Sequence, residues 1–286
     1  MKKGYKNLKE FLDAPGTIGL VVEGGGMRSI FANSTLLALS QNGYAERFNV
    51  ATGSSAGATH IYYMLGGNSQ YAIDLNTSLL PNAGFVDFKR FSKIMDVGIL
   101  EDFMYKEDSK HGTVKKMRSS KTKLVVPLTD IEKTKQVSFD LRKVEDPIHM
   151  LCAGMSVPVL DNEVRYIDGV GYIDSGLLDI LPIHLIETEC DRILVIRTSK
   201  KNKYKPYRLL HGLISKIIYH STLKAGYKIA LKSLKNKEKS FKRMKEEDIF
   251  VIHPPKGIDI TRTSHSEEQL LVASKATLKM MDNLLS

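Results

Sequence analysis

Twice near its N-terminus, the chain passes from a short apolar run through a glycine-containing turn into a helical apolar pattern. The first passage runs from residues 17–22 into the glycine run Gly24–Gly26, and the second runs from 48–52 into Gly53–Gly57, the string GSSAG. Strands that alternate with helices in this way favour a parallel sheet with helices packed on it. The expected fold class is therefore α/β, a three-layer α/β/α sandwich with a mainly parallel sheet.

The same alternation continues to the C-terminus. Further strands are predicted at 123–128 and 136–139, as a hairpin at 164–173, and at 192–197 and 249–252. Helices are predicted at 30–41, 56–65, 91–105 and 147–153, and a last helix is predicted to begin with the capping-box pattern Ser264-x-x-Glu267. The polar region 68–120 is a candidate cap or lid. No linker interrupts the pattern, so residues 1–286 are expected to form one domain.

Composition narrows the functional classes. With 286 residues and 42% hydrophobic content, the chain can bury a substantial core. Its two cysteines, Cys152 and Cys190, form no CxxC or Cys/His pattern, so neither a disulfide framework nor a zinc site is indicated, and no cofactor is expected. No signal peptide or spanning segment is apparent, so the expected location is the cytoplasm, with attachment to a membrane surface as an alternative.

Ser55 lies at the centre of the GSSAG string, between a predicted strand and a predicted helix. A strained strand-to-helix turn flanked by small residues exposes a serine hydroxyl, and the helix that follows points its first N–H groups toward an anion. The string alone is weak, and an ordinary glycine-serine turn is the competing interpretation. In its strand-and-helix setting, the string predicts that Ser55 is a nucleophile.

The glycine run supplies the second requirement of acyl transfer, a set of bare backbone N–H groups that can hold an oxyanion. The candidate donors are Gly24, Gly25, Gly26, Met27 and Arg28. A dinucleotide fingerprint would need a glycine where Ser29 stands, and no P-loop lysine follows, so phosphate-binding loops are disfavoured. Arg28 is expected to hold the loop, to face an anionic head group, or to have only a structural role.

The serine needs a base, and Asp174 is the first candidate, since it stands where an apolar strand gives way to Ser175 and Gly176. A turn-capping role for Asp174 is the alternative. Ser55, Asp174 and His253 also follow the chain order of α/β-hydrolases, which leaves a Ser-His-Asp triad open, although His253 can equally be an ordinary histidine after a strand. Asp168 is a nearby decoy that lacks the apolar-proline continuation.

Three blocks together resemble the patatin-like phospholipases, in particular their compact bacterial branch. They are Glu23–Arg28 (EGGGMR), Gly53–Gly57 and Tyr172–Gly176 (YIDSG) with the downstream Ile180–Ile183 (ILPI), and they occur in the family's order. The resemblance implies a lipid acyl hydrolase that acts through a Ser55–Asp174 dyad, without histidine or metal, with an oxyanion hole around Gly25 and Gly26. Its substrates would be acyl esters of lipids.

Two positions depart from the family pattern. Ser29 stands where the family usually has glycine, and Ser175 stands where the aspartate is usually followed by glycine. A serine at 175 can tolerate the turn or tighten it by a local hydrogen bond. Because of these changes, a non-catalytic protein that binds lipid or an anionic membrane surface on the same fold remains the alternative from a different class.

One segment makes the protein basic. The formal net charge is +10, and residues 200–245 hold fifteen lysines and arginines against one acid, Glu238. Six lysines recur at helical spacing on one face, namely Lys224, Lys228, Lys232, Lys235, Lys239 and Lys242. Such a helix suits an anionic membrane, and a solvated charged face over a core-packed stripe is the competing interpretation. No nucleic-acid-recognition pattern accompanies it, so nucleic-acid binding is not expected.

Overall fold

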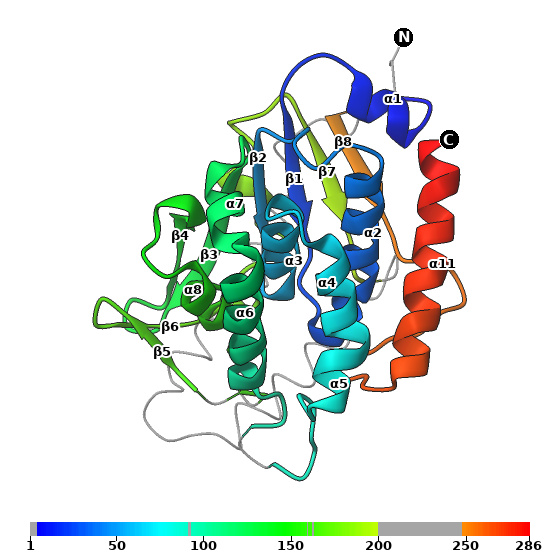
Figure 1. Ribbon diagram of the computed structural model, residues 1–286. Coiled ribbons are helices and arrows are strands. Elements are labelled where there is room, and N and C mark those ends of the chain that lie inside the picture. The colour runs from blue at the N-terminus through cyan, green and yellow to red at the C-terminus, as the bar shows by residue number, and fades with distance from the viewer. Residues whose placement is uncertain (1–4, 91–92, 159, 162, 200–247) are drawn as a thin grey trace.

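The fold is seen in a computed structural model that describes residues 5–90, 93–158, 160–161, 163–199 and 248–286. An eight-stranded sheet runs through it in the order β5-β6-β3-β2-β1-β7-β8, and β4 pairs with β3 beside this path. The six lysines predicted to face a membrane, Lys224, Lys228, Lys232, Lys235, Lys239 and Lys242, lie outside the described residues. Figure 1 shows the strands and the helices that cover them.

The strands are β1 (Ile18–Val22), β2 (Val50–Gly53), β3 (Lys123–Asp130), β4 (Lys135–Asp140), β5 (Arg165–Ile167), β6 (Val170–Asp174), β7 (Arg192–Ile196) and β8 (Ile249–Ile252). The α-helices are α1 (Leu8–Asp13), α2 (Ile30–Gln41), α3 (Ala56–Leu65), α4 (Ser69–Asp74), α5 (Leu80–Asn82), α6 (Val97–His111), α7 (Thr113–Ser119), α8 (Pro147–Ala153) and α11 (Glu267–Leu285). Short 3₁₀ turns include η1 (Gly26–Ser29), η3 (Leu141–Lys143), η4 (Ser175–Leu177) and η5 (Ile183–Leu185), and η2 (Leu75–Leu79) is a π-helix.

The strands β3, β2, β1, β7 and β8 pair in parallel, whereas β4, β5 and β6 pair antiparallel. Alternate residues of the parallel strands point to opposite faces. Leu20 and Leu194 belong to the larger core beneath the α-helices, and Val21 and Val195 belong to a smaller core that contains Ile183 of η5. A sheet buried on both faces explains the unbroken apolar strands, and it confirms the predicted α/β class.

The pairing of β3 brings two distant strand ends together. Strand β4 pairs along Val125–Asp130 on one edge of β3. Because Val125 also pairs with Thr52 of β2, and Leu128 also pairs with Asp174 of β6, both β2 and β6 lie on the other edge. β2 runs parallel to β3 and β6 runs antiparallel to it, so their C-terminal ends approach each other head-on. The residues that follow Gly53 therefore meet Asp174.

Two predicted helix starts are wrong. Helix α6 begins at Val97 rather than near residue 91, because the Asp96 side chain accepts the N–H of Gly98 and Met95 is held in an antiparallel bridge with Val86. In the last helix, the N-cap is Ser266, whose side chain accepts the N–H of Gln269.

The predicted cap, Ser264, instead accepts the N–H of Thr261 at 2.9 Å. The sequence offers two serines two positions apart, and only the path of the preceding loop selects between them.

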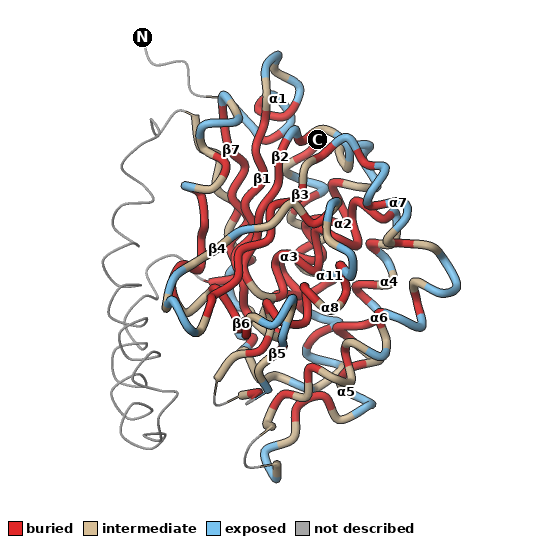
Figure 2. Tube along the Cα trace, turned by 90° about the vertical axis from the view of Figure 1, so that its left-hand side faces the viewer, coloured by how far each residue is buried: buried red, intermediate tan, exposed pale blue. Residues whose placement is uncertain are grey.

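The region 68–120, the candidate cap or lid for which one helix was predicted, is largely helical. It contains α4, η2, α5, α6 and α7, and its inward faces bury apolar side chains such as Leu75, Leu100 and Met104. Figure 2 shows buried residues along these helices and exposed residues at their connecting loops. The region packs on the larger core, and it also contributes to the cavity described below.

Candidate active site

Ser55 occupies a sharp turn between β2 and α3. Its backbone has φ 53° and ψ −137°, a conformation that costs energy for a residue with a side chain. The flanking glycines make the turn possible. A Cβ on Gly53 would lie 2.7 Å from the carbonyl carbon of Gly57, and a Cβ on Gly57 would lie 2.6 Å from the carbonyl oxygen of Val22. The strain and the close packing together hold the Ser55 hydroxyl clear of its own helix.

Asp174 ends β6 and is 3% exposed. Its carboxylate accepts the N–H of Gly176 at 2.5 Å and lies close enough to the Ser55 side chain for Ser55 to lower its pKa. Burial raises the pKa of Asp174 above the ordinary aspartate value, although Ser55, the bond from Gly176 and the nearby charge of Arg262 oppose that rise. The predicted pair thus lies in contact, and Asp174 also makes the turn-capping bond that was its alternative role.

The other two candidates for the base lie elsewhere. Asp168 is exposed in the tight turn between β5 and β6, with φ 50°. His253 follows β8, which is separated from β2 by β1 and β7 in the sheet. Three strand spacings amount to about 14 Å, too far for a hydrogen bond. Among the described residues, neither side chain lines the cavity that contains Ser55 and Asp174.

The glycine loop uses some of its N–H groups and leaves others available. Met27 donates its N–H to the carbonyl of Arg262 at 3.0 Å, and Arg28 donates to the carbonyl of Gly25 at 3.2 Å. Within the described part of the chain, the N–H groups of Gly25 and Gly26 donate to no protein acceptor. Of the five candidate donors, these two are therefore the ones available to a ligand.

Gly24 is held in place by the turn that carries Ser55. Its N–H donates to the Ser54 hydroxyl at 3.2 Å, and that hydroxyl donates to the carbonyl of Ile180 at 2.9 Å. A Cβ on Gly24 would lie 2.7 Å from the carbonyl oxygen of Ser54. The glycine loop and the serine turn are thus packed backbone against backbone, which only a glycine at this position allows.

Arg28 does not line the cavity. Its half-buried guanidinium lies near Glu23 and Arg197, and burial lowers the pKa of Arg28. Its Nε is buried without a hydrogen-bond partner among the described residues. The cation that does line the cavity is Arg262, whose pKa is lowered to about 10 by burial and by the neighbouring Arg28. Arg262 lies in a loop far along the chain, and no motif in the sequence marked it.

Ser55 and Asp174 open into a largely apolar cavity of about 910 Å³, its open mouth included. Its apolar walls are Met27, Leu75, Leu80, Phe85, Met95, Val97, Leu100, Met155, Val157, Leu160, Leu177 and Ile180. The predicted cap region supplies Leu75 to Leu100 of this set, so it forms one wall.

A polar group that the sequence did not reveal interrupts the apolar wall. The Ser29 hydroxyl lies 2.7 Å from His60 Nε2, and Asn76 Nδ2 donates to the same hydroxyl at 3.4 Å. Burial lowers the pKa of His60 to about 3, so the ring is neutral. Ser29, one of the two departures from the family pattern, is therefore occupied in a hydrogen bond. At the other departure, the Ser175 hydroxyl is buried and has no partner among the described residues.

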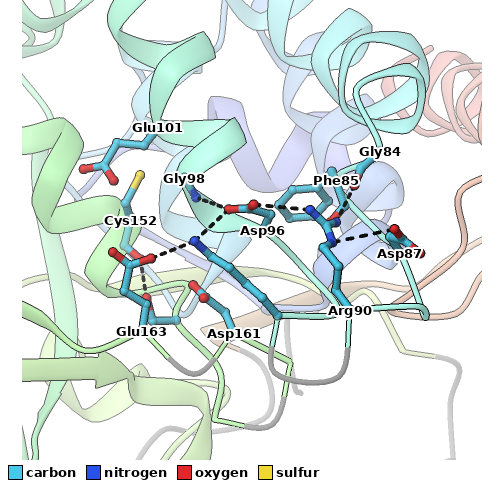
Figure 3. Close-up of polar contacts among 12 residues, drawn as sticks. Gly84, Phe85, Asp87, Arg90, Asp96, Gly98, Glu101, Cys152, Asp161 and Glu163 are labelled. Atoms are coloured by element: carbon cyan, nitrogen blue, oxygen red, sulfur yellow. Dashed lines mark hydrogen bonds and ion pairs between the residues drawn. The ribbon is translucent and has the colours of Figure 1, made fainter.

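The loop before α6 forms the outer side of the cavity and is held by arginine. Arg90 Nη2 donates to the carbonyls of Gly84, at 2.5 Å, and Phe85, at 3.1 Å. Its Nη1 lies 3.2 Å from Asp96 Oδ2, and its Nε lies 3.9 Å from Asp87 Oδ2. Figure 3 shows Arg90 between these partners. The loop is thus folded on itself around one guanidinium.

The same loop is tied to the segment before β5. Lys93 Nζ lies 3.0 Å from Asp96 and 2.9 Å from Glu163, and the N–H of Met95 donates to the carbonyl of Leu160 at 2.8 Å. Because Met95 and Leu160 both line the cavity, these contacts join two parts of its outer wall.

Within the described residues, no three His, Cys, Asp or Glu side chains gather as metal ligands. In that same part of the chain, no helix is long and apolar enough to cross a membrane.

The fold and the site define an α/β protein with a serine on a strand-turn-helix elbow beside a buried carboxylate. The sequence profile of the family described as "Patatin-like phospholipase" matches residues 20–186, more than half of the chain. The chain belongs to this family, as its motifs predicted. Among curated protein sequences, none is significantly similar to it.

Two solved structures resemble this chain to different degrees. The crystal structure of VipD from Legionella pneumophila superposes with a TM-score of 0.54 at 15% sequence identity, over 95% of this chain and 67% of VipD. A structure of SpcU in complex with ExoU from the type III secretion system of Pseudomonas aeruginosa matches with a TM-score of 0.35 at 14% identity, over 80% of this chain and 53% of the other. At these identities, the likeness to VipD supports the fold alone.

Proposed function

We propose that the protein is a serine lipid acyl hydrolase in which Ser55 is the nucleophile and Asp174 is the general base. The observation that carries this proposal is that Ser55 and the buried Asp174 carboxylate line the same apolar cavity, with the Ser55 side chain close enough to lower the pKa of the carboxylate. An ordinary aspartate is a weak base at neutral pH. Burial raises the pKa of Asp174, which makes this carboxylate a stronger base and brings its pKa closer to the pH at which proton transfer is efficient.

In the proposed reaction, Ser55 Oγ attacks the ester carbonyl carbon while Asp174 takes the hydroxyl proton. The oxyanion that forms accepts the N–H groups of Gly25 and Gly26, each worth about 3 kcal/mol of transition-state stabilisation. The intermediate then collapses, and Asp174 returns the proton to the departing alcohol. Water attacks the acyl-enzyme and gives a proton to Asp174. Asp174 then passes that proton to Ser55 Oγ as the bond between the acyl carbon and Oγ breaks, which releases the fatty acid and restores both residues.

The proposed substrates are carboxylic esters of phospholipids, lysophospholipids or related lipids. The apolar walls of the cavity suit an acyl chain, and family membership favours a lipid ester. We also propose that the lysine-rich segment contacts an anionic membrane. This part of the proposal rests on the sequence alone. The dyad is proposed to work without a metal or cofactor, because the Ser-Asp pair and backbone N–H groups supply the nucleophile, the base and the oxyanion donors.

The triad alternative with His253 is less well supported. That histidine follows β8, three strands away from β2, whereas Asp174 lies beside Ser55 in the same cavity. The non-catalytic alternative rested on Ser29 and Ser175. Among the described residues, the Ser29 hydroxyl bonds to His60 and the Ser175 hydroxyl has no partner, so neither side chain competes for Ser55 or Asp174.

The deciding experiment is reaction with a fluorophosphonate probe, followed by hydrolysis of liposomes of varied anionic content. The wild type should be labelled at Ser55 and should release fatty acid, whereas Ser55→Ala should do neither. Folded wild-type protein that resists the probe would contradict the enzyme and favour the lipid-binding alternative. Release of fatty acid that does not depend on anionic lipid would argue against the membrane role of the lysines.

A further inference from the structure

The glycine loop begins at Glu23, a carboxylate that takes no part in the proposed reaction. Glu23 is 1% exposed and directly follows β1. Burial alone would raise its pKa, but the Arg197 guanidinium and the Ser199 hydroxyl hold the pKa of Glu23 below the ordinary value. Glu23 is therefore a buried, ionised side chain next to the oxyanion donors, and a charge in that place calls for an explanation.

The donors to Glu23 all come from the chain that follows β7. Its Oε2 accepts Arg197 Nε at 2.7 Å, the N–H of Thr198 at 2.9 Å and the N–H of Ser199 at 3.1 Å. The Ser199 hydroxyl lies 2.8 Å from Oε1. The Glu23 carboxylate therefore does more than pair with the charge of Arg197. Because one of its oxygens accepts two successive backbone N–H groups, it also fixes the path of the main chain at Thr198.

Thr198 in turn holds the glycine loop. Its hydroxyl donates to the carbonyl of Gly24 at 2.7 Å, and a Cβ on Gly25 would lie 2.8 Å from the same hydroxyl oxygen. The carbonyl of Gly24 and the N–H of Gly25 belong to one planar trans peptide, so they point in opposite directions. The bond from Thr198 therefore sets the direction of the Gly25 N–H.

We propose that Glu23 is a positioning residue for the oxyanion hole. Its carboxylate fixes Thr198, the Thr198 hydroxyl fixes the Gly24–Gly25 peptide, and that peptide presents the Gly25 N–H to the oxyanion. This inference rests on the proposed hydrolase function. It explains why an acid opens the glycine run, and it adds a residue that the sequence motifs did not mark as functional.

The decisive variant is Glu23→Gln, which keeps the shape of the side chain but turns one acceptor oxygen into an amide donor. A reacting group misplaced by about 1 Å costs on the order of 100-fold in rate. We expect kcat for a soluble ester to fall 10- to 100-fold, with KM and the pH midpoint unchanged. Thr198→Val removes only the hydroxyl that contacts Gly24, and it should give the same split between kcat and KM.

Glu107→Gln is the matched control. Glu107 is 2% exposed on α6 and accepts the Thr113 hydroxyl at 2.5 Å, far along the chain from the glycine loop. The same chemical change there should leave kcat within twofold of the wild type. A fall in kcat of equal size in Glu107→Gln and Glu23→Gln would overturn the positioning role, since it would mean that any buried glutamate matters equally.

If Glu23→Gln does not fold, the pair Glu23→Met with Arg197→Met removes both charges, so that neither is left buried alone. This pair should fold and still lose kcat. A kcat within twofold of the wild type in Glu23→Gln, or in the pair, would overturn the inference.

A second readout separates this inference from the proposed function. Wild-type protein that neither reacts with the fluorophosphonate nor hydrolyses esters would defeat the hydrolase, but the amide resonance of Gly25 still reports on the loop. That resonance should shift in Glu23→Gln and in Thr198→Val and stay in place in Glu107→Gln. An unchanged Gly25 resonance in the first two variants would overturn the positioning role.

Discussion

Ion pairs hold the molecule on both sides of the cavity, yet in different surroundings. On the catalytic side, Arg197 Nε lies 2.7 Å from Glu23, with side-chain exposures of 6% and 2%. On the outer wall, Lys93 Nζ lies 2.9 Å from Glu163, with exposures of 34% and 49%. The distances are nearly equal, so burial is what distinguishes the two pairs.

That difference predicts how firmly each side is held. An exposed pair contributes about 0.2–1 kcal/mol and is screened by salt. Removing one partner of a buried pair costs about 3–5 kcal/mol, because it leaves the other charge without compensation. The glycine loop, which must aim N–H groups at a developing charge, is held by the buried pair. The loop before α6 is joined to Glu163, in the segment before β5, by the exposed one.

The largest effect is expected at the centre of the catalytic side. Asp174→Asn removes the proposed base, so kcat should fall on the order of 10³- to 10⁴-fold, as for other residues of catalytic dyads and triads. Steady-state ester hydrolysis is the measurement, with His253→Ala as the control that should retain activity. If His253→Ala abolished hydrolysis and Asp174→Asn did not, the Ser-His-Asp alternative would replace the dyad.

The stability of Asp174→Asn gives an independent check. Because burial raises the pKa of Asp174, the folded state favours its neutral form, and the wild type loses stability as pH rises through that pKa. A neutral asparagine avoids this loss. Its melting temperature at pH 7 should therefore be no lower than that of the wild type, and a marked drop would show that the ionised carboxylate stabilises the fold.

The pH dependence of activity should follow Asp174. The base must be ionised, so kcat should rise with pH, with a midpoint above the ordinary aspartate value because burial raises this pKa. Arg262 opposes that rise by its charge, so Arg262→Gln should move the midpoint to higher pH. A pH–rate profile on a soluble ester measures both, and a shift to lower pH in Arg262→Gln would contradict the assignment.

The outer wall should control which acyl chains enter. Val157 lines the cavity, and Val157→Phe would place a ring in the space proposed for the acyl chain. We expect kcat/KM for long-chain esters to fall about tenfold relative to short-chain esters, in the range that small changes in an apolar pocket produce. Equal losses for all chain lengths would indicate damage to the catalytic side and not to the wall.

Breaking the outer ion pair should matter much less than breaking the inner one. Glu163→Gln should lower the free energy of unfolding by less than about 1 kcal/mol, and the difference should vanish near 1 M salt. Denaturant melts at low and high salt test this, and kcat should stay within twofold. A loss of activity similar to that expected for Glu23→Gln would erase the distinction between the two sides.

A small effect of the opposite sign is expected next to Asp174. The Ser175 hydroxyl is buried without a partner among the described residues, and a buried unsatisfied hydroxyl costs about 1–3 kcal/mol. Ser175→Ala removes it, so the protein should become more stable by about 1 kcal/mol with kcat unchanged. Lower stability in this variant would mean that the hydroxyl is satisfied in solution.

Much of the catalytic side could be predicted from the sequence because its parts are local. The small residues around Ser55 follow from the steric limits of one turn, and a glycine run after a strand has bare N–H groups wherever it folds. The same holds for helices α2, α3 and α8, whose predicted bounds agree with the structure. The position of Asp174 at the end of a strand was predicted, but which other strand that end meets depends on distant parts of the chain.

Other features could not be read from the sequence, because they depend on which distant segments meet. Two serines could each have capped the last helix, and the loop from Thr261 selects Ser266. Five N–H groups could have served an oxyanion, and Arg262, Ser54 and the loop's own turn engage three of them. In the sequence, His60 is a polar residue in a mostly apolar helix. Only the fold brings Ser29 and Asn76 beside it, so its hydrogen bond could not be predicted.

By itself, the sequence determined an α/β chain with a serine elbow, a glycine loop and an aspartate at a strand end, since each depends on a few consecutive residues. Only the tertiary structure decided that Ser55 and Asp174 touch, because β2 and β6 share one edge of β3 from opposite directions. It likewise decided that Glu23 binds Thr198, 175 positions away, because hydrogen-bond partners so far apart are chosen by the pairing of strands and not by local pattern.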